Sequence, residues 1–365
     1  MAAKLIGVGL IGCGNIGQIH AASLGNLAAA GAGIRPVMAA DVSAECREEA
    51  CSNWAFERLV SDPEELIADP EVDAVYICTP TPTHRDLIYS VLKAKKHLYS
   101  EKPLAPSFDT VKEICARVMA APVIAQVGFQ MRWNAMHAQV KKYIETGELG
   151  RPMSYLARDD EAWPTTAVSS FASDWRSQKK FSGGGPLMEH SIHALDLASW
   201  MFGPARRVSA ATSSVFGYDV EDAAALSLTH ESGVIGTLLT LYGGVEGREE
   251  SRFEVFFERG VVEITWGVLV STEENSFRLE MAGESAVRIA PDELLTQHLQ
   301  RLGVQTRPNF WNELASRAFF ESIRAGRPAA PGFQDALIAH ATVEAAYRSA
   351  REKRMVELKE LIGGA

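Results

Sequence analysis

Short apolar segments alternate with segments of helical periodicity through residues 4–127, and this alternation constrains the fold more than any other feature. Strands are predicted at 5–11, 35–40, 73–78, 97–99 and 123–127, and helices near 16–30, 44–55, 82–94 and 107–119. Strands that alternate with helices are joined by right-handed crossovers and run parallel to one another. The sequence therefore predicts an N-terminal α/β domain with a parallel sheet.

The pattern changes after Gly128. Helices are predicted at 136–145, 187–201, 309–323 and 334–351, whereas strand patterns dominate 206–289. The segment 251–257 is the clearest strand, because Phe253, Val255 and Phe257 alternate onto one face. Strands that follow one another without intervening helices favour an antiparallel or mixed sheet.

Length and composition favour a soluble protein of two domains. The chain has 365 residues, too many for one core, so we expect domains at 1–128 and 129–365. A formal net charge of −10, without any Lys/Arg block, argues against nucleic acid and favours a small-molecule partner. No apolar run is long enough for a membrane span, and no signal peptide is evident. Five scattered cysteines without a Cys-x-x-Cys pair suit reduced thiols, so we expect a cytoplasmic protein without a zinc site.

A Gly-x-Gly-x-x-Gly motif directly follows the first predicted strand. It consists of Gly12, Cys13, Gly14, Asn15, Ile16 and Gly17. Its glycines permit a tight turn, close approach to a pyrophosphate and close packing of helix on strand. The helix N-terminus then offers free amides to the phosphates. In this strand–turn–helix context the motif predicts a dinucleotide site; the alternative is an ordinary glycine-rich turn.

Asp41 supports the dinucleotide interpretation, because it follows the second predicted strand. An acid there accepts hydrogen bonds from a ribose diol and repels a 2′-phosphate, which favours NAD over NADP. Arg35 and Arg47 keep NADP possible. Asp41 is alternatively a helix N-cap.

Residues 79–84 follow the strand predicted at 73–78 and alternate threonine with proline before His84. Small hydroxyls and rigid prolines suit a wall along a dinucleotide, so Thr79, Thr81 and His84 are candidate cofactor contacts. A simple strand-to-helix turn is an equally good interpretation of Thr81 and His84.

Glu101, Lys102 and Pro103 follow the strand predicted at 97–99. Ligands of open parallel sheets bind outside the carboxyl ends of the strands, so a lysine at such an end is a candidate for chemistry. Proline restricts the backbone and places this lysine on a stiff segment.

Glu189, His193 and Asp196 are spaced to share one face of the helix predicted at 187–201. A histidine with a nearby carboxylate can accept a proton from a hydroxyl and return it. The alternative is a helix N-terminus with a core histidine. A zinc site through His190 is weak, because no third ligand is evident.

Two further segments carry aromatic and polar residues suited to a polar, ring-shaped ligand. They contain Gln130 and Arg132, and Trp175 and Arg176, with Trp163 nearby. These five residues are therefore candidates for contact with such a ligand. Each tryptophan is alternatively ordinary core.

Together these residues resemble the Gfo/Idh/MocA family of glucose–fructose oxidoreductases and inositol dehydrogenases. The resemblance runs from Gly12–Gly17 through Asp41 and 79–84 to 101–103, then to the run 183–196 and the closing stretch 326–336. It implies an N-terminal Rossmann domain with a doubly wound parallel sheet. It also implies a C-terminal α/β domain with a large, open, mostly antiparallel sheet.

The resemblance also implies roles for single residues. Lys102 is expected beside the nicotinamide and the reacting oxygen, Glu101 at the cofactor, and His193 as the general acid/base. Further contacts are expected at the cofactor from Gln130, Trp175 and Arg176, and at the substrate from Arg132 and Trp163. The Lys102–Pro103 bond is expected to be cis. Glu189 stands where aspartate is more common in the family, and its longer side chain alters its contact with a substrate hydroxyl.

The function implied is NAD(P)-dependent hydride transfer to or from a secondary hydroxyl of a sugar, inositol or related polyol, with Lys102, His193 and Glu189 as catalytic residues. The alternatives are a catalytically silent sugar or dinucleotide sensor and an NADP-dependent reductase of a non-sugar substrate. An open sheet with an apolar face needs cover, so we also expect a homodimer or homotetramer.

Overall fold

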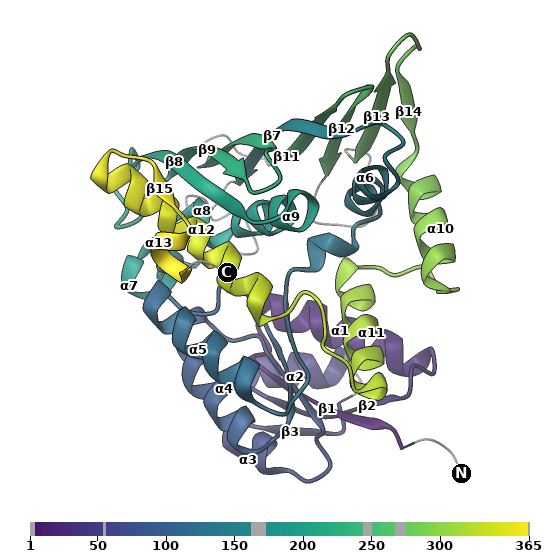
Figure 1. Ribbon diagram of the computed structural model, residues 1–365. Coiled ribbons are helices and arrows are strands. Elements are labelled where there is room, and N and C mark those ends of the chain that lie inside the picture. The colour runs from purple at the N-terminus through teal and green to yellow at the C-terminus, as the bar shows by residue number, and fades with distance from the viewer. Residues whose placement is uncertain (1–3, 54–55, 162–172, 244–249, 267–274, 364–365) are drawn as a thin grey trace. The chain divides into compact units, whose positions relative to one another are not determined.

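Contacts within the computed structural model divide the chain into two units. The first comprises Met1–Gln130 and Pro308–Leu337, and the second comprises Met131–Arg307 and Ile338–Ala365. The structure describes residues 4–53, 56–161, 173–243, 250–266 and 275–363 (Figure 1). The predicted division into 1–128 and 129–365 assigns 308–337 to the second domain, whereas these residues pack with the first unit.

The first unit is built on six parallel strands in the order β3-β2-β1-β4-β5-β6. They are β1 (Ile6–Ile11), β2 (Ile34–Ala40), β3 (Arg58–Val60), β4 (Ala74–Ile77), β5 (His97–Ser100) and β6 (Ala125–Val127). Every neighbouring pair is parallel, which confirms the predicted doubly wound sheet. The chain order reverses between β1 and β4, and ligands of open α/β sheets bind at such a switch point.

Helices connect these strands. They are α1 (Asn15–Ala29), α2 (Ala44–Asn53), α3 (Pro63–Ala68), η1 (Thr81–Thr83), α4 (His84–Lys93) and α5 (Phe108–Ala120). The helices α1, α2, α4 and α5 lie where the sequence predicts helices, whereas β3 and α3 were not predicted. Asp62 caps α3 by accepting a hydrogen bond from the Glu64 amide, and Pro63 is the first residue of the helix. This short helix is therefore marked in the sequence by its N-terminal residues and not by a periodic apolar pattern.

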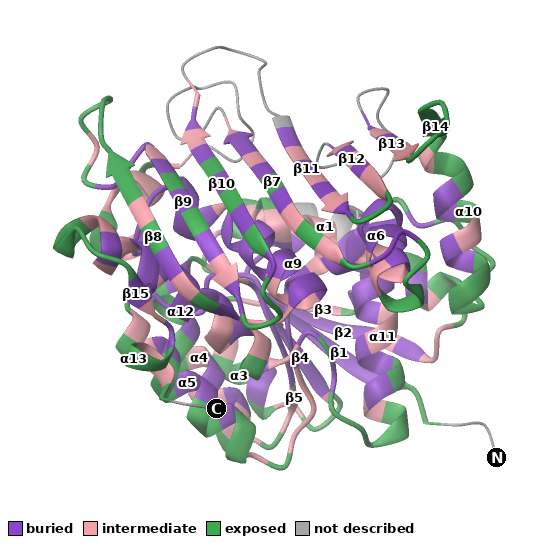
Figure 2. Cartoon of the chain, turned by 45° about the horizontal axis from the view of Figure 1, so that its top comes forward, coloured by how far each residue is buried: buried purple, intermediate pink, exposed green. Residues whose placement is uncertain are grey.

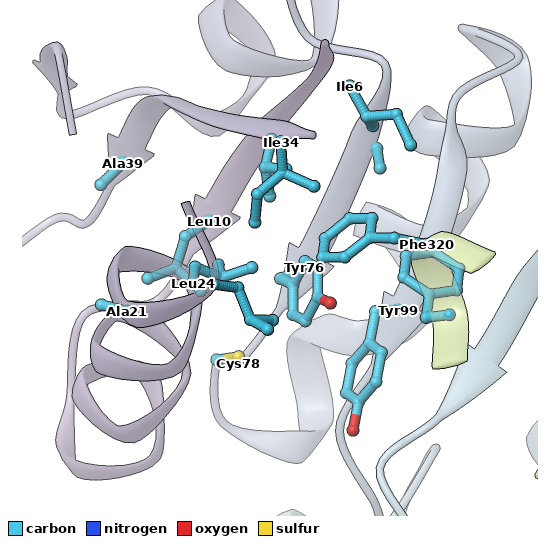
Figure 3. Close-up of a cluster of buried hydrophobic side chains, with 14 of the residues drawn as sticks. Ile6, Leu10, Ala21, Leu24, Ile34, Ala39, Tyr76, Cys78, Tyr99 and Phe320 are labelled. Carbon is cyan, nitrogen blue, oxygen red and sulfur yellow. The ribbon is translucent and has the colours of Figure 1, made fainter. Parts of the chain in front are cut away.

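The core of the first unit draws on both of its segments. Leu10 of β1 and Leu24 of α1 pack with Tyr76 of β4 and Phe320 of α11 (Trp311–Ala325) (Figure 3). The Tyr76 and Tyr99 rings stack on the neighbouring strands β4 and β5, with 4.5 Å between centroids. Because Phe320 is almost fully buried in this cluster, the late segment belongs to the core of the first unit.

The second unit is built on a nine-stranded sheet of order β14-β13-β12-β11-β7-β10-β9-β8-β15. Its strands are β7 (Pro152–Glu161), β8 (Ala205–Ser213), β9 (Ala223–His230), β10 (Ile235–Tyr242), β11 (Glu250–Phe257), β12 (Gly260–Trp266), β13 (Ser276–Met281), β14 (Val287–Ile289) and β15 (Val356–Glu357). Among the described strand pairs of this sheet, only β7 and β10 run parallel, which confirms a mostly antiparallel sheet. Buried and exposed residues alternate along β9 and β10 (Figure 2). Phe253, Val255 and Phe257, which were predicted to share one face of a strand, are all buried on β11.

The remaining helices are η2 (Gln130–Trp133), α6 (Ala135–Thr146), η3 (Asp174–Ser177), α7 (Lys179–Ser182), α8 (Pro186–Glu189), α9 (Ile192–Phe202), α10 (Pro291–Leu302), α12 (Phe333–Glu352) and α13 (Lys359–Ile362). The strand β7 and the helix α10 were not predicted. In the part of the chain that the structure describes, no helix combines the length and apolar character needed to cross a bilayer.

The helix predicted at 187–201 is interrupted, and this prediction is wrong. α8 ends at Glu189 and α9 begins at Ile192, with His190 and Ser191 between them. The Ser191 hydroxyl donates to Asp159 Oδ2 at 2.9 Å, and His190 Nε2 lies 3.0 Å from Asp159 Oδ1. These bonds to β7 compete with a continuous helix, so Glu189 does not share one helix face with His193 and Asp196.

Candidate active site

The glycine-rich segment follows β1 and ends in the first turn of α1. Gly12 has a φ of +93°, and a Cβ added there would lie 2.7 Å from the Cys78 carbonyl. A Cβ at Gly17 would lie 1.9 Å from the Gly12 carbonyl oxygen. At Gly14 an added Cβ would meet no heavy atom of the described residues within 4 Å. Gly12 and Gly17 therefore serve the fold, whereas Gly14 keeps an open approach to the backbone.

The start of α1 suits an anion. Asn15 and Ile16 form its first residues, and no acidic side chain lies in the first turn. The positive end of the helix dipole and its amides are thus directed at the loop, as in sites that bind a pyrophosphate. Together with Gly14, this cradle fits the phosphates of a dinucleotide.

Asp41 braces the glycine-rich loop from the end of β2. Its Oδ2 accepts a hydrogen bond from the Cys13 amide at 2.7 Å, and its Oδ1 accepts one from the Ser43 amide at 2.8 Å. Burial, followed by the charge of Asp41, raises the pKa of the Cys13 thiol to about 12. The carboxylate is half-buried and sits where a Rossmann site holds the ribose diol.

Arg35 and Arg47, the two arginines that could bind the 2′-phosphate of NADP, differ in their contacts. Arg35 forms ion pairs with Glu57 and Glu71, so its charge is already paired. Arg47 donates to the Asp41 backbone carbonyl at 2.5 Å, next to the loop. Arg47 alone of the two therefore adjoins the expected ribose position.

Residues 79–84 form the turn after β4. The Thr83 hydroxyl donates to Thr79 Oγ1 at 2.6 Å, and Thr81 is buried. His84 is fully buried, with Nδ1 2.9 Å from the Pro103 carbonyl oxygen and Nε2 2.8 Å from that of Thr79. Burial lowers the pKa of His84. These contacts give the ring a structural role in tying two loops together, and cofactor contacts by Thr79, Thr81 and His84 remain predictions.

The segment from Glu101 to Pro103 follows β5, at the same sheet edge as the glycine-rich loop after β1. The Lys102–Pro103 bond is cis, as expected. Glu101 is 4% exposed, and its Oε2 accepts a hydrogen bond from the Lys102 amide at 3.2 Å. A Cβ at Gly128 would lie 2.5 Å from Glu101 Oε1, so this glycine makes room for the carboxylate. Lys102 itself is half-buried on a fixed backbone.

Within the second unit, Glu189 and Arg176 form an ion pair. Glu189 is 2% exposed at the end of α8, and its Oε2 accepts a hydrogen bond from Arg176 Nε at 3.1 Å. The Arg176 guanidinium also lies over the Trp175 ring, 4.4 Å from its centroid. Glu189 therefore adjoins the predicted Trp175–Arg176 pair. Trp163 lies outside the described residues.

His193 and Asp196 lie on α9 and are both buried. Asp196 accepts hydrogen bonds from Arg132 Nε at 2.8 Å and Arg132 Nη2 at 2.6 Å, which is a bidentate pair. Arg132 is thus committed to an ion pair with α9, and its expected contact with substrate remains a prediction. Gln130 lies at the end of the first unit, where η2 begins.

Sequence reasoning missed the bonds of two polar side chains beside these residues, the half-buried His190 and the buried Glu221. The His190 ring lies between two carboxylates: Nε2 is 3.0 Å from Asp159 Oδ1, and Nδ1 is 3.2 Å from Glu161 Oε2. Glu221 accepts hydrogen bonds from the Gly185 amide at 2.8 Å and the Tyr347 hydroxyl at 2.8 Å, and so fixes the start of α8. The partners lie far apart in sequence, so no local pattern signals them.

Comparison with known proteins identifies the family. Residues 6–129 match the family model of the Gfo/Idh/MocA oxidoreductases for the NAD-binding Rossmann fold, and residues 141–358 match the model for their C-terminal alpha/beta domain. The chain belongs to the Gfo/Idh/MocA oxidoreductase family. The resemblance drawn from the sequence is therefore confirmed.

Several members of this family are similar over nearly their whole length. Myo-inositol 2-dehydrogenase of Thermotoga maritima is 30% identical over 98% of this chain and 99% of its own. Inositol 2-dehydrogenase of Rhizobium meliloti is 27% identical over 96% of this chain and 98% of its own. A structure of levoglucosan dehydrogenase in complex with NADH matches the fold with a TM-score of 0.86, at 24% identity, over 97% of this chain and 99% of that chain.

As a Gfo/Idh/MocA member, the protein is an oxidoreductase with NAD as its cofactor. The residues of the first unit fit that cofactor, because Gly14 leaves the start of α1 accessible and Asp41 lies at the end of β2. Bound NAD would be held by the α1 amides at its pyrophosphate and by Asp41 at a ribose.

Proposed function

We propose that this protein is an NAD-dependent dehydrogenase that reversibly oxidises a secondary hydroxyl of an inositol, a sugar or a related polyol. The observation that carries the proposal is Lys102 on an anchored backbone, at the same sheet edge as the dinucleotide cradle. This placement supports a role for the Lys102 amine in chemistry beside a bound cofactor. The similarity to inositol dehydrogenases over almost the entire chain supports the substrate class.

Three side chains divide the chemistry in this proposal. The imidazole of His193 accepts the proton of the substrate hydroxyl, and Lys102 Nζ stabilises the negative charge that develops on the oxygen. Glu189, fixed by Arg176, accepts a hydrogen bond from a neighbouring substrate hydroxyl. The nicotinamide ring of bound NAD supplies the hydride acceptor.

The test is a panel of inositols, sugars and other polyols, each offered with NAD and with NADP, and followed by the absorbance of reduced nicotinamide. The proposal predicts turnover of at least one compound with NAD as the preferred cofactor. If no polyol is oxidised and no corresponding ketone is reduced, although NAD binds, the substrate class is wrong. A strong preference for NADP would contradict the role of Asp41.

We further propose a homodimer or homotetramer that covers the exposed face of the nine-stranded sheet. Leu156 of β7 and Ile235 and Leu239 of β10 are 48%, 56% and 42% exposed, and β7 and β10 are neighbouring central strands. Apolar side chains in the middle of a sheet favour a partner surface. Light scattering should give a multiple of the 39.7 kDa chain mass, and Leu239→Glu should shift it toward the monomer. A monomeric wild-type protein would contradict this assembly.

A cytoplasmic location is proposed from the thiols alone. Cys13, Cys46, Cys78 and Cys115 are free cysteines, as a reducing compartment permits.

A further inference from the structure

His20 is a buried imidazole on the helix that starts at the dinucleotide cradle. It follows Gly17 by three residues on α1, on the same buried face as Ala21 and Leu24, and its exposure is 0%. Burying an imidazole among apolar side chains is costly unless the ring is hydrogen-bonded. Its partner therefore explains why histidine is tolerated there.

That partner is the glutamate beside Lys102. His20 Nε2 lies 2.7 Å from Glu101 Oε1, and the pair is 81 residues apart in sequence. The other carboxylate oxygen, Oε2, accepts the Lys102 amide at 3.2 Å. One carboxylate thus joins α1 to the Lys102 backbone, and both of its oxygens are engaged.

Neighbouring groups fix the orientation of the His20 ring. The Tyr76 and Tyr99 rings lie 5.4 Å and 5.1 Å from it, centroid to centroid. Figure 3 shows the two tyrosine rings side by side in the core of the first unit. An ionised carboxylate only accepts hydrogen bonds, so Nε2 carries the N–H in this arrangement.

We propose that His20 is a positioning residue, which holds the Glu101 carboxylate and thereby sets the place of Lys102 relative to the dinucleotide cradle. This inference rests on the proposed role of Lys102 in the reaction. His20 touches neither substrate nor reacting atoms and acts through Glu101. The bond fixes two segments of one unit, the start of α1 and the end of β5, that must serve the same cofactor.

Two variants and a matched control test the inference by kinetics. His20→Phe keeps a ring of similar size but cannot donate to Glu101, and a misplacement of about 1 Å lowers rates about 100-fold. We expect a fall in kcat of that order, with the Kd for NAD within about threefold of wild type. His20→Gln places an amide N–H near the position of Nε2 and should restore most of the activity. Ser23→Ala, on the same helix and equally buried, loses only a bond to the Ile19 carbonyl and should leave kcat unchanged.

A second readout is independent of turnover. Lysine side chains are labelled by reductive ¹³C-methylation, and the Lys102 signal is assigned with Lys102→Arg. The inference predicts a shifted or broadened Lys102 signal in His20→Phe, and a wild-type signal in His20→Gln and Ser23→Ala. If His20→Phe does not fold, Glu101→Gln, which retains the side-chain shape, must move the signal in the same way.

The outcomes separate this inference from the proposed function. An unchanged Lys102 signal together with an unchanged kcat in His20→Phe would overturn the positioning role. A changed signal in a protein whose Lys102→Ala variant retains full activity would support the positioning of Lys102 and refute its proposed catalytic role. Equal loss of activity in His20→Phe and His20→Gln, with unmoved Lys102 signals, would mark a merely structural residue and also overturn the inference.

Discussion

Gly14→Ala separates the folding and binding roles of the glycine-rich loop. Gly14 has φ −69° and ψ −169°, which alanine adopts freely, and an added Cβ meets no described heavy atom within 4 Å. Alanine is a poorer N-cap than glycine, but it also restricts the unfolded chain. These effects are each about 0.5–1 kcal/mol and opposite in sign. The free energy of unfolding should therefore change by less than about 1 kcal/mol.

The same methyl group should impair cofactor binding. It occupies the space through which the backbone approaches a pyrophosphate. We expect the Kd for NAD to rise at least about tenfold, which is about 1.4 kcal/mol. Titration calorimetry with NAD measures this change, and urea denaturation of the same samples measures stability.

Gly17→Ala provides the contrast, because its Cβ would lie 1.9 Å from the Gly12 carbonyl oxygen. The backbone must shift, at a cost of about 1–3 kcal/mol in a well-packed region. Gly17→Ala should therefore lower the denaturation midpoint, whereas Gly14→Ala should not. Unchanged NAD affinity in Gly14→Ala, or equal destabilisation of both variants, would refute this division of roles.

Three further predictions concern charged side chains. Arg132→Met should destabilise the protein by about 3–5 kcal/mol, because it removes the bidentate partner of the buried Asp196 carboxylate, and adding Asp196→Leu should recover most of the loss in thermal unfolding. Asp41→Ser should move the ratio of NAD to NADP affinity at least about tenfold toward NADP, measured by calorimetry, since a repelling charge is removed. Asp159 has a lowered pKa: burial raises it, but the charge of His190 and the hydrogen bonds that Asp159 accepts outweigh burial. Ionised Asp159 therefore stabilises the folded protein fully at pH values above 3.8, its ordinary pKa, and this contribution is lost as the pH falls through the lower pKa of the folded state. Asp159→Asn should therefore make the free energy of unfolding depend less on pH in the acid range.

Local patterns were sufficient to predict the parallel sheet and the dinucleotide cradle. The strand at 5–11, the three glycines and Asp41 lie within 41 residues, and each signal depends on near neighbours. Glu101 and Lys102 were identified because they follow a short apolar strand. The structure places them where that pattern predicts, at the sheet edge that also carries the glycine-rich loop.

Other features depend on partners distant in sequence. The break between α8 and α9 arises because His190 and Ser191 bond Asp159, about 30 residues earlier, and helical spacing alone predicted one helix. His20 was missed because a single histidine on an apolar helix face resembles an ordinary core residue. Its role appears only when Glu101 is brought beside it by the sheet.

Single-turnover reduction of NAD by an active polyol tests the central claim most directly. Wild type is compared with Lys102→Ala and His193→Ala at saturating NAD, so that the rate reports the chemical step. Loss of general acid–base catalysis or of a placed charge lowers such rates about 100-fold or more. The account predicts a loss of that size in both variants, with NAD affinity retained. Undiminished rates in both would contradict it.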